Sequence, residues 1–229
     1  MKNFTTLVEE GFKIYKQKIA SILILMLIFS GLIMILSILI SFISPEGIIE
    51  NGGYLAVLLI FGIYLLMIFL STFIGFSLVL LVTKPVETKL KEIFQEVWKK
   101  LWQYLLVTIL VGFFMMTASF LLIIPGIIVG VYLAFSSFAF IIEGEKGINA
   151  LKRSWDLVNG NWWKVFGRII LLNIIIGVIY ATLILINDSL GNVFQCLSMP
   201  FGIIFMYLIY LELKKSKGIQ VPTQIQPQV

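Results

Sequence analysis

Residues 104–142 read YLLVTILVGFFMMTASFLLIIPGIIVGVYLAFSSFAFII, a stretch of 39 residues without a charge. A single α-helix of that length would be about 58 Å long at 1.5 Å per residue, roughly twice the hydrocarbon thickness of a bilayer. Pro125 and Gly126 stand in the middle of the stretch. Proline interrupts the backbone hydrogen bonds of a helix, and glycine allows the chain to reverse. The stretch therefore predicts two membrane spans, 104–124 and 126–142, joined by a tight turn at Pro125.

The rest of the chain contains four more apolar stretches that are long enough to cross a bilayer, at about 20 residues or more each. Their predicted ranges are 19–43, 54–83, 165–186 and 190–211. The 229 residues are 60% hydrophobic and only 13% charged, with a mean hydropathy of +1.05. Soluble domains carry about a quarter charged residues. The composition predicts an all-α, polytopic membrane protein with six transmembrane helices in one domain, 1–216, followed by a disordered cytoplasmic tail, 217–229.

The basic residues all fall on one side of these six spans. The segments on that side, together with Arg168 just inside the fifth span, hold all 17 Lys and Arg; they are 1–18, 84–103, 143–164 and 212–229. The loops on the opposite side contain only the acids Glu46, Glu50 and Asp188. Lys and Arg are enriched in the cytoplasmic loops of membrane proteins. We therefore expect a multi-pass protein of the cell membrane with both termini in the cytoplasm.

A stretch with helical periodicity precedes the first, third and fifth spans, at 4–16, 86–104 and 146–158. In each, apolar residues share one face and charged residues the other. This pattern predicts three amphipathic cytoplasmic helices, with their apolar faces toward the bilayer and their lysines toward anionic lipid headgroups. The repeated order of amphipathic helix, span, turn and span indicates either an internal duplication or the usual gathering of Trp, Tyr and Lys at membrane interfaces.

The sequence offers little for chemistry. It has no histidine, one cysteine (Cys196), and no P-loop, zinc-ligand set or nucleophile triad, so we expect no catalytic residue, no metal, no cofactor and no nucleic-acid partner. Ionisable residues near the middle of a span usually mark a transport path, and these spans contain none. The composition favours a non-enzymatic membrane scaffold, lipid-interacting or envelope-associated module. The alternative functions are a transporter or permease component and an immunity protein against a membrane-active peptide. A second copy of the chain or another membrane protein is left open as a partner.

The densest pattern runs from the Pro-Gly turn to residue 166. It begins with the turn Pro125-Gly126 and continues with an acidic residue and a glycine, Glu143 and Gly144, at the end of a span. The motif Ala-Leu-x-x-Ser-Trp follows, with Ala150, Leu151, Ser154 and Trp155. It ends with Gly-x-x-Trp, which is Gly160 and Trp163. This pattern resembles the membrane-domain superfamily of glycerophosphodiester phosphodiesterases and the uncharacterised six-span membrane proteins of the YciC type. The resemblance implies the six-span fold. It does not imply hydrolase activity, because the phosphodiesterase barrel is absent.

The motif also has a physical interpretation of its own. Glu143 ends the fourth span, and Lys152 and Arg153 follow nine and ten residues later on the next predicted helix. Trp155 would anchor that helix in the interface, and Gly160 would end it. We expect a structural clamp between the Glu143 carboxylate and these cations; a lipid-headgroup or partner site is the alternative.

Overall fold

The computed structural model describes residues 2–42 and 53–219, and every regular element in these ranges is helical. The elements are α1 (Phe4–Phe42), α3 (Gly53–Thr83), α4 (Leu90–Leu121), α5 (Ile123–Leu133), α6 (Ser136–Phe138), the π-helix η1 (Ala139–Glu143), α7 (Ile148–Val158), α8 (Trp162–Ile186) and α9 (Asp188–Ser216). Six helical segments within them are long and apolar enough to cross a membrane. The prediction of an all-helical chain with six such helices is confirmed. The predicted loop 44–53 between the first two spans, apart from its last residue, and most of the predicted tail 217–229 lie outside the described residues.

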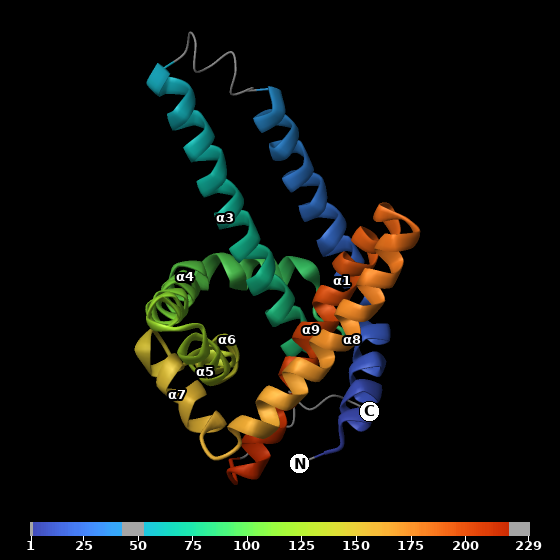
Figure 1. Ribbon diagram of the computed structural model, residues 1–229, viewed down its shortest axis with the longest axis vertical. Helices are drawn as coiled ribbons and strands as arrows, with labels where there is room; N and C mark the ends of the chain where they lie inside the picture. The colour runs from blue at the N-terminus through green and yellow to red at the C-terminus, as the bar shows by residue number, and fades with distance from the viewer. Residues whose placement is uncertain (1, 43–52, 220–229) are drawn as a thin grey trace.

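The long helices pair into three hairpins, α1 with α3, α4 with α5, and α8 with α9. In Figure 1, α1 and α3 run along the long axis, α8 and α9 run obliquely, and the second part of α4 is seen nearly end-on together with α5. The hairpins therefore diverge from a common base and do not form one parallel bundle.

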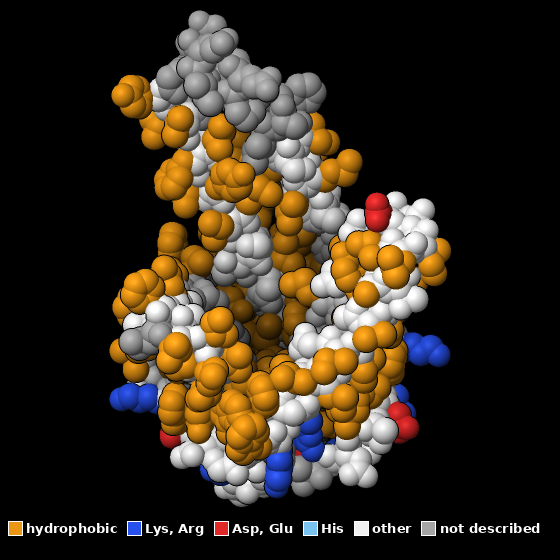
Figure 2. All heavy atoms as spheres, in the orientation of Figure 1, with side chains coloured by type: hydrophobic (Ala, Val, Ile, Leu, Met, Phe, Trp, Pro, Cys, Tyr) orange, Lys and Arg blue, Asp and Glu red, His pale blue; other side chains and the backbone are white. Residues whose placement is uncertain are grey.

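The common base of the hairpins is the packed core. All residues from Phe76 to Thr83 in α3 and from Tyr207 to Lys214 in α9 are buried. The buried side chains of α1, α4 and α7 pack against the same core. Away from it, large apolar side chains stay exposed along the hairpins, for example Met34, Phe113 and Val178. Figure 2 shows hydrophobic side chains over the diverging hairpins, and on the face in view Lys and Arg lie only in the lower half.

Two of the three predicted amphipathic helices are not separate helices. Residues 4–16 are the beginning of α1, and most of 86–104 is the beginning of α4, each continuous with its span; only α7 stands alone. Most residues of their apolar stripes pack against protein, and Leu7, Ile93, Val97 and Leu101 are buried, whereas Phe12 and Val86 are 60% and 52% exposed. The physical reason is that the last turns of α3 and α9 already provide these stripes with apolar partners.

The reversal between the third and fourth spans lies at Leu122, so the predicted turn at Pro125 was wrong. Leu122 has an extended backbone (φ −167°, ψ 153°) and separates α4 from α5. Pro125 is the third residue of α5, in the first turn, where backbone N–H groups have no intrahelical acceptor and proline is tolerated. Gly126 has a different use: a Cβ atom there would lie 3.1 Å from the Cα of Ser119 in α4. Its missing side chain lets the two helices of the hairpin approach closely.

Candidate functional site

The helix of the fourth predicted span is broken near its C-terminal end, and this break places Glu143. After α5 ends at Leu133, the short α6 leads into the π-helix η1, whose last residue is Glu143. Gly144 follows with φ +76°, a backbone conformation that glycine adopts without steric cost. The Gly144 N–H donates to the carbonyl of Phe140 at 3.1 Å, which completes the end of the helix. Isolated π turns inside helices are frequent at functional sites.

Both oxygens of the Glu143 carboxylate are bound by side chains from two other helices. Nε of Arg153, on α7, donates to Oε2 at 2.5 Å. Oε1 accepts the hydroxyl proton of Tyr210, on α9, and lies 3.2 Å from the ammonium Nζ of Lys214. The carboxylate thus joins the end of the fourth span to α7 and to the last turns of α9. We call Glu143, Arg153, Tyr210 and Lys214 the Glu143 clamp.

The clamp is largely shielded from water, which makes its ion pairs stronger than surface pairs. The side chain of Glu143 is 14% exposed, that of Lys214 5% and that of Arg153 26%. Desolvation alone would lower the pKa of Arg153, but the hydrogen bond and the negative charge of Glu143 outweigh it and raise that pKa. The Glu143 carboxylate therefore favours the charged form of the Arg153 guanidinium.

Ser154 holds the break in the fourth span from the neighbouring helix. Its hydroxyl donates to the carbonyl of Tyr132 at 2.6 Å and accepts the N–H of Phe135 at 3.1 Å. These are backbone groups at the point where α5 stops and α6 begins. Because Ser154 is fully buried, no water can replace it there. The serine of the sequence motif therefore forms hydrogen bonds with backbone groups at the point where the helix is interrupted.

The rest of the motif divides between this site and other places. Trp155 stacks on Tyr132, with ring centroids 3.9 Å apart, so it binds α7 to α5 although part of its surface is exposed. Gly160 has φ +82° just after the end of α7, as predicted. Lys152 is exposed and is not part of the clamp. Trp163 is 77% exposed, and its ring contacts are with Trp162 and Phe166 of its own helix.

A second carboxylate, that of Glu212 on α9, joins further elements at the same end of the molecule. Oε2 of Glu212 accepts from the Arg168 guanidinium, on α8, at 2.5 Å. Its other oxygen accepts the backbone N–H of Lys2, and Arg168 also donates to the Lys2 carbonyl. One turn later, Nζ of Lys217 donates to the carbonyl of Asn159 at 2.9 Å. The end of α9 is therefore joined to the N-terminal segment, α7 and α8.

Sequence reasoning placed Glu143, Gly144, Arg153, Ser154 and Trp155 in one motif, and the structure brings them together. It does not bring Pro125 and Gly126 there, because they belong to the opposite end of the span, against α4. Sequence reasoning missed the two α9 partners, Tyr210 and Lys214. The only signal for them is their spacing of four residues, which puts a hydroxyl and a cation on one face of the last helix.

The geometry suits mechanical connection between helices. Within the described residues, no three or more His, Cys, Asp or Glu side chains lie close enough to hold a metal ion.

A family model described as a domain of unknown function, DUF7847, matches residues 48–209. No curated protein and no solved structure matches the chain. The matched range includes Glu143, Arg153 and Ser154 and ends one residue before Tyr210.

Proposed function

The chain belongs to the DUF7847 family, and we propose that it is a non-enzymatic integral membrane protein that acts as a lipid-contacting scaffold. In this proposal it crosses the cell membrane six times with both termini in the cytoplasm. Its diverging hairpins present apolar surfaces to lipid or to neighbouring membrane proteins. The clamped end keeps the three hairpins in a fixed relation to each other.

The observation that carries the proposal is the separation of charge from apolar surface. The carboxylates of Glu143 and Glu212 are bound by cations of the same chain at the packed base. Apolar side chains cover the hairpins beyond that base (Figure 2). Groups that are already bound within the protein stabilise its fold, and large exposed apolar surfaces bind lipid or other helices.

The topology part of the proposal is tested with single cysteines. In a Cys196→Ser background, we place a cysteine at Asn187, between α8 and α9, or at Ser216, at the end of α9. A membrane-impermeant maleimide added to intact cells should label position 187 only, and permeabilised cells should be labelled at both. Labelling of position 216 in intact cells would overturn the six-span topology.

The scaffold part is tested by envelope integrity in cells that lack the protein. We expect deletion to increase the entry of a DNA-binding dye, and the unmodified protein to restore the barrier. Glu143→Gln should restore it poorly, whereas the matched variant Lys152→Gln, at an exposed position outside the clamp, should restore it fully. If deletion leaves the barrier intact and instead abolishes the uptake of a solute, the scaffold proposal is wrong.

The same measurement separates the transporter alternative, which so far has weaker support. Asn173, near the middle of α8, is exposed, and its side-chain amide donates to the carbonyl of Ile169 in its own helix at 2.8 Å. The view in Figure 2 shows a hollow between the hairpins with hydrophobic side chains at its floor. A path for polar solutes would need polar groups there.

A further inference from the structure

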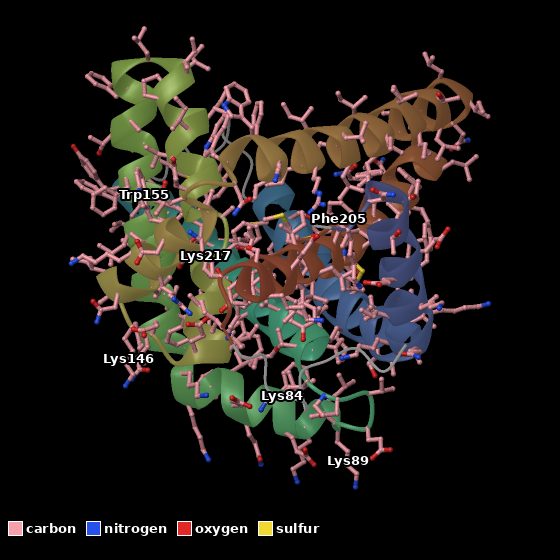
Figure 3. The ribbon with its side chains drawn as sticks, turned by 90° about the horizontal axis from the view of Figure 1, so that it is seen from below. Lys84, Lys89, Lys146, Trp155, Phe205 and Lys217 are labelled. Atoms are coloured by element: carbon pink, nitrogen blue, oxygen red, sulfur yellow. The ribbon has the colours of Figure 1, made fainter. Side chains whose placement is uncertain are left out.

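A groove on the outside of the molecule combines an aromatic floor with two exposed lysines. It has a volume of about 750 Å³ and is lined by Phe73 of α3 and by residues of the first part of α4, which are Lys91, Phe94, Gln95, Trp98 and Lys99. This volume lies in the range of small-molecule binding sites in proteins. In Figure 3 the first part of α4, which begins next to Lys89, crosses the lower edge of the view, and several of its side chains point away from the other helices.

The floor of the groove is built by three different helices. The rings of Phe73 and Phe94 stack with centroids 6.0 Å apart, and Trp98 meets Phe73 edge-on at 6.4 Å. Phe29 of α1 supports both phenylalanines from behind, at 5.8 and 6.4 Å. The floor is therefore fixed by packing. Trp98 nevertheless keeps 68% of its surface exposed, so the groove leaves a large apolar face uncovered by this chain.

The charge at the rim of the groove is positive. Among the described residues, Lys91 and Lys99 form no ion pair with a carboxylate. The nearby carboxylate of Glu96 does not line the groove and is occupied by Lys84 at 2.9 Å and Lys100 at 2.8 Å. Two cations beside an exposed aromatic surface suit a ligand that has both a negative headgroup and an apolar part.

Beyond the groove, the exposed face of α4 continues as apolar surface. Trp102 is 78% exposed, and Leu106, Ile109 and Phe113 follow it at helical spacing, each at least half exposed. The two lysines of the groove therefore lie beside exposed aromatic rings, and α4 continues with exposed apolar side chains. In a bilayer, lysine and tryptophan are typical of the headgroup and interface level, and apolar side chains lie among the acyl chains.

From this juxtaposition we infer that the groove between α3 and α4 binds an anionic glycerophospholipid. Lys91 and Lys99 contact its phosphate and headgroup, and the upper acyl chain lies on Trp98, Phe94 and Phe73. The inference rests on the membrane location in the proposed function, but not on the scaffold role. A water-soluble phosphate compound would use the lysines and leave the aromatic floor uncovered, so the floor favours the lipid.

The test uses Trp98 as the reporter of lipid contact. The other four tryptophans, Trp102, Trp155, Trp162 and Trp163, are replaced by phenylalanine, and the protein is reconstituted with phosphatidylglycerol or phosphatidylcholine brominated on the upper acyl chain. Bromine quenches a tryptophan only at close range. We expect quenching at lower mole fractions of the anionic lipid than of the neutral one. Each lysine near an anionic surface contributes about 1 kcal/mol, which is a factor of about five in relative affinity.

The variants Lys91→Gln and Lys99→Gln should each reduce the preference for phosphatidylglycerol about five-fold. The matched control is Lys152→Gln, which removes one exposed lysine outside the groove and should keep the preference. Glycerol 1-phosphate in the buffer should not relieve the quenching. Equal quenching by both lipids, an unchanged preference in the lysine variants, or relief by glycerol phosphate would each overturn the inference. Absence of quenching by either lipid would instead contradict the membrane location itself.

A measurement on the unmodified protein covers the case in which the single-tryptophan variant does not fold. A photoactivatable phosphatidylglycerol with its reactive group on the upper acyl chain is crosslinked in vesicles, and the labelled peptides are identified by mass spectrometry. We expect labelling within residues 91–102, reduced about 25-fold when ordinary phosphatidylglycerol replaces phosphatidylcholine as the competing lipid, because two lysines contribute a factor of about five each. Labelling spread evenly over the exposed faces of all hairpins would show ordinary solvation by lipid and no site.

Discussion

Replacing Glu143 with glutamine removes the only negative charge of the clamp and keeps its shape. Lys214 then remains 5% exposed without a carboxylate, and Arg153 loses the partner that its Nε contacts at 2.5 Å. Removing one member of a buried ion pair costs about 3–5 kcal/mol, because the remaining charge is poorly solvated. Arg153, at 26% exposed, can turn toward water, so we expect the lower end, about 3 kcal/mol.

The consequence of this loss is local opening of α7, which proteolysis detects. Trypsin added to inside-out vesicles cleaves after Lys152 once α7 detaches. When opening and closing are fast relative to cleavage, the rate follows the population of the open form. A loss of about 3 kcal/mol corresponds to about 150-fold faster cleavage, since each 1.4 kcal/mol is a factor of ten.

Three further variants make this prediction refutable. The variant Glu92→Gln, at an exposed position on α4, should be cleaved at the same rate as the unmodified protein. The variant Glu96→Gln should lose at most about 1 kcal/mol of stability, because the lysine partners of Glu96 are well exposed. Combining Glu143→Gln with Lys214→Met removes the stranded cation and should restore much of the protection. If Glu143→Gln cleaves at the unmodified rate, or if Lys214→Met brings no recovery, the carboxylate does not act as a clamp.

Other substitutions test the remaining contacts by unfolding in SDS. Ser154→Ala removes the partner of the buried Phe135 N–H and the hydrogen bond to the Tyr132 carbonyl, and should lower the free energy of unfolding by about 2 kcal/mol; no change would mean that these backbone groups find other partners. Gly126→Ala forces a Cβ against Ser119 and should cost about 2 kcal/mol, whereas Gly112→Ala, with open space around it, should be neutral or slightly stabilising. Gly160→Ala should cost about 1 kcal/mol because φ is +82° there; an equal stability would show that α7 can end differently.

The number and approximate position of the apolar helices could be predicted because length and hydropathy determine them directly. The predicted ranges 54–83 and 165–186 agree closely with α3 and α8. The position of the chain reversal between the third and fourth spans could not be predicted, because a Pro-Gly pair indicates either a turn or the first turn of a helix. Only the close contact of Gly126 with Ser119 distinguishes the two, and that contact depends on how α4 packs.

The candidate site was predictable where it is local in sequence. Glu143 and Arg153 are ten residues apart across a glycine-rich turn, and their pairing follows from that spacing. Tyr210 lies 67 residues from Glu143 in the chain, and no pattern along one helix indicates which other helix it will meet. Periodicity shows that a helix face is apolar and does not show what covers it. The sequence therefore predicts lipid contact for the amphipathic stretches at the start of α1 and α4, whereas in the structure most of their apolar residues pack against protein.

The π-helix in front of Glu143 has a consequence for register. A π turn accommodates one residue more than an α turn in the same length, and one residue corresponds to a rotation of about 100° around a helix axis. If all the residues of η1 were instead wound as ordinary α-helix, the extra residue would rotate Glu143 by about 100° relative to the residues before η1. The carboxylate would then no longer face α7 and α9 together. The direction in which Glu143 points therefore depends on the π turn before it as much as on the identity of the residue itself.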